Sequence, residues 1–198
     1  ELMKERQRGE PIAYLVGHRG FWTLDLLVTP DVLVPRAETE LLVELALKQI
    51  PPERQHAIAD LGTGTGAVAI AIARERPQCT VFATDLSPEA LAVAMQNAAV
   101  LGTRNISFHA GDWFAALRGK RFAVVVSNPP YIVDGDPHLA LDGLPFEPRM
   151  ALTDGAAGGD GLACIRHIVA EAAAHLLPGG WLLFEHGYDQ GAASRNLL

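Results

Sequence analysis

The sequence predicts an α/β fold built on a doubly wound, mostly parallel sheet. Three observations lead to this prediction. Short apolar runs of strand length alternate with longer segments of helical periodicity along the chain. A glycine-rich turn at residues 62–66 follows the first core strand. Polar residues follow several further strands, at the sheet edge where open α/β folds bind their ligands.

A small β-hairpin and a helix are expected before the core. Residues 21–28 alternate partly between apolar and polar side chains, which is typical of a strand. The turn signal at residues 29–31 and the apolar residues 32–34 predict a short return strand. A helix follows over residues 38–49, and two prolines at positions 51 and 52 end it.

The core is expected to contain five strands, at residues 57–61, 80–84, 105–109, 122–126 and 181–185. Helices are expected from the glycine-rich turn to about residue 76, over 88–101 behind an N-cap at Ser87, and over 162–177. The Pro-Gly-Gly sequence at residues 178–180 predicts a turn. Residues 134–161, rich in Gly, Pro and Asp, predict a long irregular loop, either one that closes over a substrate or a disordered insertion.

Charge and composition limit the partners of the chain. Its 198 residues carry a net charge of −7, with a pI of about 5.4, which argues against a duplex-DNA binder that depends on counterion release. Cys79 and Cys164 lack metal-ligand spacing, so we expect both to be buried and reduced. No signal peptide or run of membrane-spanning length is visible. We therefore expect a cytoplasmic monomer without a membrane partner or a direct nucleic-acid partner.

The chain divides into two expected regions. Residues 1–50 hold a linker helix, the hairpin and the helix that leads into the core, and residues 51–198 form the cofactor-binding domain. The chain starts with a charged, helix-prone segment that has no initiator Met, and it ends in a segment with the pattern of another helix. We therefore expect a fragment of a longer protein.

The glycine-rich turn predicts a cofactor site made of Asp60, Gly62, Thr63, Gly64, Thr65 and Gly66. Its glycines permit a tight turn and let a ligand approach the backbone. Gly62, Gly64 and Ala67 also satisfy the dinucleotide fingerprint, so a dehydrogenase is an alternative, and a tight structural turn is another. Asp60 either orients the amino-acid part of a cofactor through its charge or caps the turn.

The ends of the next two core strands extend this site. Asp85 lies about 20 residues beyond the turn, where a carboxylate accepts hydrogen bonds from ribose hydroxyls. The alternative for Asp85 is an acidic charge at the start of the following helix. Asp112 and Trp113 follow the third core strand. Trp113 is expected to stack on adenine and Asp112 to accept a hydrogen bond, unless Trp113 is a core aromatic.

The fourth core strand ends in Asn128-Pro129-Pro130-Tyr131. Neither proline has a backbone N–H, so this corner offers carbonyl acceptors, and the Asn128 side-chain oxygen adds another. Tyr131 adds a flat aromatic face. Such a lip suits a planar group that carries NH2, either a carboxamide or the amino group of a base, although a Pro-rich turn alone is the alternative. In the usual doubly wound order this strand lies beside the first, which brings Asn128 next to the glycine-rich turn. This convergence favours S-adenosylmethionine over a nicotinamide cofactor and predicts methyl transfer to nitrogen.

The chain resembles the HemK/PrmC family of release-factor glutamine methyltransferases over nearly all of its length. The resemblance includes residues 9–15, 21–22, 34–36, 38–40, 60–66, 85, 128–131, 146–149, 151–152 and 159–162. The segments at residues 9–15, 34–40 and 146–152 are the most specific to this family. Gly20 and Ala37 depart from it, where Glu and Pro are expected.

The resemblance implies a class I, Rossmann-like methyltransferase that produces S-adenosylhomocysteine. Its substrate would be the glutamine of the Gly-Gly-Gln motif in peptide chain release factors, methylated at the side-chain nitrogen. Asn128, Pro129 and Tyr131 would be catalytic, and Pro130 would join them in binding the substrate. The resemblance also implies a helical domain before residue 1 and a closing strand pair after residue 198, so the final strands of the sheet are expected to be missing from this chain.

Three rival functions are compatible with parts of this pattern. An adenine-N6 methyltransferase acting on DNA or RNA uses the same kind of Asn-Pro-Pro-Tyr corner, although the acidity of the chain argues against it. An NAD-linked oxidoreductase fits the glycine-rich turn but has no use for that corner. A catalytically idle binding module is disfavoured by the intact Asn128.

Overall fold

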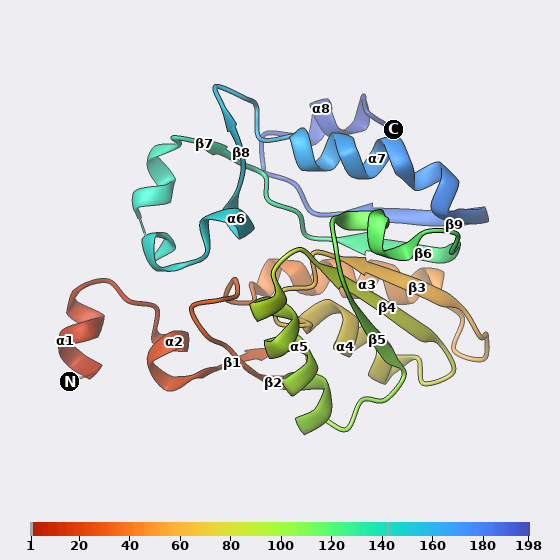
Figure 1. Cartoon of the computed structure of the whole chain (residues 1–198), viewed down its shortest axis with the longest axis horizontal. Helices are drawn as coiled ribbons and strands as arrows, with labels where there is room; N and C mark the ends of the chain where they lie inside the picture. Colours follow the sequence, from red (N-terminus) through yellow and green to blue (C-terminus); the bar gives the residue numbers. More distant parts are fainter. Residues whose placement is uncertain (1, 142) are drawn as a thin grey trace.

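The computed structural model describes residues 2–141 and 143–198. Its centre is a five-stranded sheet in the order β5-β4-β3-β6-β9, and every neighbouring pair is parallel (Figure 1). The strands are β3 (Ala57–Leu61), β4 (Thr80–Asp85), β5 (Ile106–Ala110), β6 (Phe122–Ser127) and β9 (Leu176–Phe184). The strand order reverses between β3 and β6, so the predicted doubly wound fold is confirmed and Asn128 follows the strand beside β3.

Helices cover both faces of the sheet because successive strand residues point to opposite sides. On one face, Ile58 and Val124 pack with α3 (Glu40–Gln49), α4 (Ala67–Glu75) and α5 (Pro88–Val100). On the other face, Ala59 and Val125 pack with η2 (Trp113–Leu117) and α7 (Ala163–His175). The chain then runs into α8 (Gly191–Arg195), which agrees with the helical pattern at its end.

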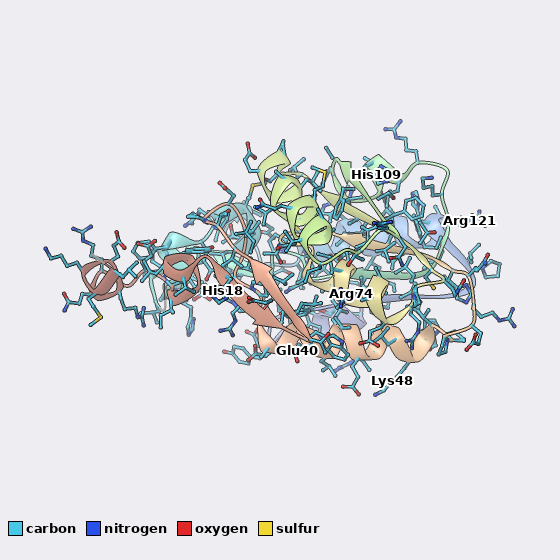
Figure 2. All side chains as sticks on the ribbon, turned by 90° about the horizontal axis from the view of Figure 1, so that it is seen from below. His18, Glu40, Lys48, Arg74, His109 and Arg121 are labelled. Carbon is cyan, nitrogen blue, oxygen red and sulfur yellow. The ribbon has the colours of Figure 1, made fainter. Side chains whose placement is uncertain are left out.

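The N-terminal hairpin is present, but its turn lies elsewhere than predicted. After α1 (Leu2–Gln7) and α2 (Ile12–Val16), β1 (His18–Phe21) pairs antiparallel with β2 (Leu24–Leu27). The prediction of one strand over residues 21–28 and a return strand over 32–34 is therefore wrong. The tight turn places Trp22 at φ 56°, and two carboxylates hold it there. The Trp22 backbone N–H donates to Glu40 Oε1 at 2.8 Å, and its indole N–H donates to Glu75 Oε1 at 3.0 Å. Glu40, at the start of α3, lies next to the hairpin (Figure 2).

Residues 32–34 form no strand among the described residues. Their apolar side chains, Val32 and Val34, are buried against α2 and α5 instead. The Val34 N–H donates to the Glu147 carboxylate at 3.0 Å, so a side chain takes the place of a partner strand.

Residues 134–141 and 143–161 contain more regular structure than the predicted irregular loop, so that prediction is wrong over much of the segment. They contain η3 (Pro137–Ala140), η4 (Leu144–Phe146), α6 (Arg149–Leu152) and β8 (Thr153–Ala157), and β8 pairs in parallel with β7 (Ile132–Asp134). An ion pair between Arg149 and Asp134 ties α6 to β7. The elements from β7 to β8 lie beyond one end of the sheet, on the same side as α1 and α2 (Figure 1).

The last core strand begins earlier than predicted. Phe122 pairs with Leu176, and Val124 pairs with Trp181, so residues 177–180 bulge out of the register. The Pro-Gly-Gly signal therefore marks an interruption within β9 rather than a turn before it, and Gly179 has a φ of 75°.

Within residues 2–141 and 143–198, no helix combines the length and apolar character needed to span a bilayer. Cys79 is buried and Cys164 is partly buried, and neither is in a disulfide. The same residues contain no cluster of three His, Cys, Asp or Glu side chains suited to a metal ion.

Candidate active site

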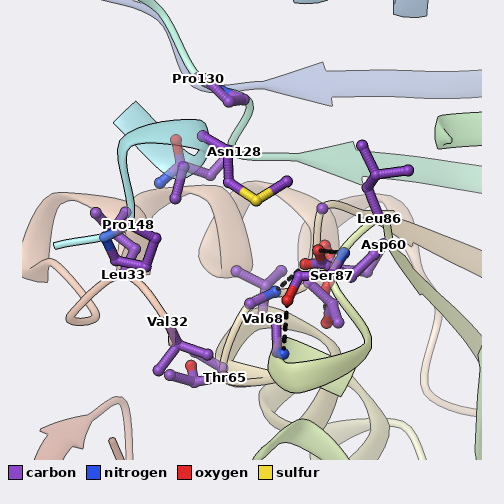
Figure 3. A pocket seen from close by; sticks show the side chains of 18 of the residues that line it. Val32, Leu33, Asp60, Thr65, Val68, Leu86, Ser87, Asn128, Pro130 and Pro148 are labelled. Atoms are coloured by element: carbon purple, nitrogen blue, oxygen red, sulfur yellow. Dashed lines mark hydrogen bonds between the residues drawn. The ribbon is translucent and has the colours of Figure 1, made fainter. Parts of the chain in front are cut away.

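A cavity of ≈ 320 Å³ lies at the carboxyl ends of β3, β4 and β6. Figure 3 shows Asn128 across this cavity from Asp60 and Ser87. Ten of the predicted site residues line it: Asp60, Gly62, Thr63, Gly64, Thr65, Asp85, Asp112, Trp113, Asn128 and Pro130. The structure therefore brings the predicted cofactor residues to one crevice at the strand-order reversal.

The glycine-rich turn wraps around the end of β4. The N–H groups of Gly62 and Thr63 both donate to the Thr84 carbonyl, at 2.9 and 2.8 Å. A Cβ on Gly62 would lie 3.2 Å from the Trp113 ring, and Gly62 also has a φ of 73°, so the position requires glycine. Gly66 does not line the cavity. Its φ of 82° starts α4, and a Cβ there would lie 3.2 Å from Ala94 Cβ, so Gly66 serves the packing of the turn against α5.

Asp60 is buried at the base of the cavity. Its Oδ2 accepts a hydrogen bond from Thr63 Oγ1 at 2.7 Å, so the carboxylate holds the turn as well as facing the cavity. Burial raises the pKa of Asp60 to about 6, and the neighbouring Asp85 adds to the rise. Hydrogen bonds from Thr63 and from the Ala69 backbone oppose it. Among the described residues, no lysine or arginine forms an ion pair with Asp60.

Asp85 joins the glycine-rich turn to the start of α5. Its Oδ2 accepts from the Gly64 N–H at 2.8 Å and its Oδ1 from the Ser87 N–H at 3.0 Å. Burial raises its pKa, and these backbone hydrogen bonds lower it. Each carboxylate oxygen has two lone pairs, so Asp85 can still accept from ligand hydroxyls. Ser87 also caps α5 as predicted, because its Oγ accepts from the Ala90 N–H at 3.0 Å.

Apolar side chains form part of the remaining wall of the cavity. Trp113 is partly buried, lies at φ 41°, and packs on the core cluster around Phe114 while it lines the cavity. Trp113 is therefore in part a core aromatic, and its stacking on adenine stays a prediction. Asp112 is exposed at the rim. Leu86 also lines the cavity although 58% of its surface is exposed. Leu86 was not among the predicted site residues.

A second cavity of ≈ 80 Å³ adjoins the first at Asn128. Leu33, Arg36, Asn128 and Ala151 line both cavities. Pro129 and Tyr131 line the smaller one, together with the apolar side chains of Ile132, Leu144 and Leu152. The Asn-Pro-Pro-Tyr corner therefore separates a large cavity from a small one, and Asn128 faces both.

A chain of hydrogen bonds holds this corner from behind. Asn128 Nδ2 donates to Thr39 Oγ1 at 3.2 Å, and Thr39 Oγ1 donates to Glu185 Oε2 at 2.8 Å. The Tyr131 hydroxyl donates to Glu185 Oε1 at 3.0 Å. Burial and the Glu185 carboxylate raise the pKa of Tyr131, so its phenol keeps its proton. Neither Thr39 nor Glu185 was predicted. A polar residue at the carboxyl end of the fifth strand was the available signal for Glu185.

Arg36 and Arg149, in two of the segments that resemble the family, have structural partners. Arg36 Nη2 lies 2.5 Å from Glu147 Oε1, and Glu147 is almost fully buried. Arg149 pairs with Asp134. Gly20 and Ala37, which depart from the expected pattern, line neither cavity.

Comparisons with known proteins agree with this geometry. Residues 37–142 match the family model of the methyltransferase small domain. The release factor glutamine methyltransferase of Xylella fastidiosa is 55% identical, and the match covers 100% of this chain and 70% of that protein. Those of Pseudomonas aeruginosa and Escherichia coli are 54% and 50% identical, covering 100% and 98% of this chain and 70% and 69% of theirs.

Solved structures share the fold at lower identity. The ribosomal protein L11 methylase of Lactobacillus delbrueckii subsp. bulgaricus superposes with a TM-score of 0.59 at 22% identity, over 82% of this chain and 68% of that one. A methyltransferase from Pyrococcus furiosus gives 0.57 at 21% identity, over 91% and 76%. These two show the Rossmann-like methyltransferase fold. The relatives at 50–55% identity show more: this chain belongs to the release factor glutamine methyltransferase family.

Proposed function

We propose that this protein transfers a methyl group from S-adenosylmethionine to the side-chain nitrogen of the glutamine in the Gly-Gly-Gln motif of peptide chain release factors. One observation carries the proposal beyond family membership. A large cavity with carboxylates and apolar walls adjoins a small cavity, and the acceptor-rich Asn128 corner lies between them. This arrangement suits a methyl donor on one side and a carboxamide on the other.

The larger cavity fits S-adenosylmethionine. The free lone pairs of Asp85 suit ribose hydroxyls, and the apolar surfaces of Trp113 and Leu86 suit an adenine ring. The buried Asp60 carboxylate suits the positive charge of the amino-acid part. When bound, the cofactor supplies an electrophilic methyl group on a positively charged sulfur and leaves as S-adenosylhomocysteine.

The smaller cavity fits a carboxamide side chain. Asn128 Oδ1 and the Pro129 carbonyl each accept one N–H of the substrate amide. Tyr131 packs on the amide plane, and the side chains of Leu33 and Ile132 enclose the aliphatic stem. The modest size of the cavity and its apolar walls favour a glutamine side chain over a nucleobase.

The protein has to position the amide nitrogen more than to activate it. The lone pair of an amide nitrogen is delocalised into its carbonyl, which makes the nitrogen a poor nucleophile. Two hydrogen bonds from the N–H groups fix the direction of the lone pair and stabilise the positive charge that grows on nitrogen. The alkylated nitrogen loses a proton readily afterwards, so no strong base is required at Asn128.

We extend the proposal to the organisation and location of the chain. Residues 51–198 form the S-adenosylmethionine-binding methyltransferase domain, and residues 1–50 lead into it from the side of the substrate. Support comes from Leu33 and Arg36, two residues of the N-terminal region that line the smaller cavity. Because release factors act with the ribosome, we place the protein in the cytoplasm. We also propose that it is a monomer.

Label transfer to different acceptors tests the proposal. The full-length protein is incubated with methyl-labelled S-adenosylmethionine and either a purified release factor or single- and double-stranded nucleic acid. We expect label in the release factor and none in nucleic acid. Label in nucleic acid alone would replace the proposed substrate with an adenine amino group. In a separate binding measurement, tighter binding of NAD than of S-adenosylhomocysteine would overturn the cofactor assignment.

A further inference from the structure

Thr39 and Glu185, from distant parts of the chain, meet the side chain of Asn128. Thr39 ends η1 (Ala37–Thr39), ahead of α3, and Glu185 follows the last residue of β9. The Thr39 hydroxyl lies between Glu185 and Asn128. Its Oγ1 is 2.8 Å from Glu185 Oε2 and 3.2 Å from Asn128 Nδ2. Thr39 is 5% exposed, so water cannot readily replace these contacts.

We propose that Glu185, acting through Thr39, is a positioning residue that fixes which end of the Asn128 amide faces the substrate. The proposal rests on the proposed function, in which Asn128 Oδ1 accepts a hydrogen bond from the substrate amide. It adds a reason why Oδ1, and not the chemically opposite NH2 group, points toward the reacting nitrogen.

The direction of the hydrogen bonds follows from the carboxylate. A carboxylate only accepts hydrogen bonds, so the hydroxyl of Thr39 has to donate its single proton to Glu185. The Thr39 oxygen then presents lone pairs to Asn128, and only the Nδ2 amide group can satisfy them. Asn128 is therefore held with Nδ2 turned back and Oδ1 available, and no described residue donates a hydrogen bond to Oδ1.

The same carboxylate also holds the aromatic side of the small cavity. Glu185 Oε1 accepts from the Tyr131 hydroxyl at 3.0 Å while Oε2 accepts from Thr39. Glu185, Asn128 and Tyr131 all line that cavity. One side chain after the end of β9 thus holds the two side chains that would contact the substrate carboxamide, Asn128 and Tyr131.

Replacing Glu185 with Gln keeps the shape and removes this directionality. A glutamine amide has one accepting and one donating end, so either Thr39 or Tyr131 loses its acceptor. If the donating end faces Thr39, the hydroxyl proton turns toward Asn128 and favours the flipped amide. Replacing Thr39 with Val breaks the chain at its middle without changing side-chain volume.

The kinetic test compares these variants in the full-length enzyme with S-adenosylmethionine and release factor. Glu185→Gln and Thr39→Val are each expected to lower kcat about 10- to 100-fold, the size of effect that small misplacements of reacting groups produce. The affinity for S-adenosylhomocysteine should stay within about twofold in Glu185→Gln, because Glu185 does not line the larger cavity. Thr39→Ser keeps the hydroxyl and should restore most of the kcat lost in Thr39→Val.

Two further variants separate positioning from general damage. Thr103 Oγ1 is buried and has no hydrogen-bond partner among the described residues, so Thr103→Val is the matched loss of a hydroxyl and should leave kcat unchanged. In an Asn128→Ala background, Thr39→Val should add less than about a twofold loss, because the group it positions is gone. Losses that multiply in that background would contradict the proposal.

A spectroscopic readout keeps this test independent of the substrate. The side-chain amide resonance of Asn128 is assigned by its disappearance in Asn128→Asp, without any release factor present. We expect slow amide-proton exchange in wild type and in Thr103→Val, and loss of that protection in Thr39→Val. Glu185→Gln should reduce the protection, because only one orientation of the glutamine amide still accepts from Thr39. Unchanged protection in both variants would overturn the relay. By contrast, a wild-type protein that keeps the protected amide but methylates no release factor would contradict the proposed function alone.

Discussion

The Gly64 N–H donates to the Asp85 carboxylate across 2.8 Å, so the glycine-rich turn after β3 and the acid that ends β4 are held as one unit. The second oxygen of Asp85 accepts from the Ser87 N–H at 3.0 Å and fixes the start of α5. A ligand that bonds to Asp85 therefore meets a group whose orientation is already set by the backbone on both sides.

Loss of the Asp85 carboxylate should weaken cofactor binding strongly. Asp85→Ala is expected to weaken the binding free energy of S-adenosylhomocysteine by about 1.5–3 kcal/mol, the range for hydrogen bonds to a charged group, and to raise the Kd accordingly. Titration calorimetry measures this change. Asp25→Ala, which removes an exposed carboxylate on the hairpin, serves as the control and should leave the Kd unchanged. Equal affinities for Asp85→Ala and wild type would remove Asp85 from the cofactor site.

The buried Asp60 should make stability depend on pH. Its pKa is raised to about 6 in the folded protein, so folding favours its protonated form. This contribution is fully present below the unfolded pKa of 3.8 and is lost as the pH rises through about 6. Relative to Asp60→Asn, the free energy of unfolding of wild type should fall by about 2 kcal/mol between about pH 4.5 and about pH 7.5. Urea unfolding at several pH values tests this, and parallel profiles for the two proteins would show that Asp60 does not carry the effect.

The ion pair between Arg36 and Glu147 should stabilise the segment that carries η4 and α6. Glu147 is buried and also accepts from the Val34 N–H, whereas the Arg36 side chain is partly exposed. Arg36→Ala leaves a buried charge with one partner fewer and should lower the free energy of unfolding by about 1–3 kcal/mol. Arg149→Ala breaks the more exposed pair with Asp134 and should cost less than about 1 kcal/mol. Equal costs in urea unfolding would contradict this ranking.

Restoring the expected proline at position 37 should stabilise the protein. Ala37 opens the 3-10 turn before Thr39, and Arg36 before it is extended at φ −99° and ψ 144°, a conformation that a following proline permits. Ala37→Pro should raise the free energy of unfolding by about 0.4–1 kcal/mol by restricting the unfolded chain. The midpoint of urea unfolding measures the gain, and a lower midpoint would mean that proline strains the turn.

The core of the fold could be predicted because β3, β4 and β6 are short, largely buried runs that are each followed by a turn signal. The hairpin could not be placed correctly, since Trp22 adopts a left-handed conformation only through acceptors on Glu40 and Glu75, 18 and 53 residues away. Composition likewise does not indicate the helices and the strand within residues 134–141 and 143–161. Their placement depends on the partners of Glu147 and Arg149, which are distant in sequence.

The cofactor crevice could be predicted from the strand order. The hydrogen bonds of Thr39 and Glu185 that hold Asn128 could not. Asp60 and Asp85 lie at the carboxyl ends of β3 and β4, and Asn128 follows β6, so the parallel order brings them to one edge. Thr39 and Glu185 are 146 residues apart, and nothing in the local pattern around either one indicates that they share a hydrogen bond.

The most direct test of the account locates the transferred methyl group. The full-length protein is incubated with labelled S-adenosylmethionine and either a wild-type release factor or one with Gly-Gly-Ala in place of Gly-Gly-Gln, and the products are sequenced by tandem mass spectrometry. The account predicts one methyl group, on the side-chain nitrogen of that glutamine, and no transfer to the alanine variant. Equal labelling of the two release factors, or labelling of neither while the cofactor still binds, would contradict it.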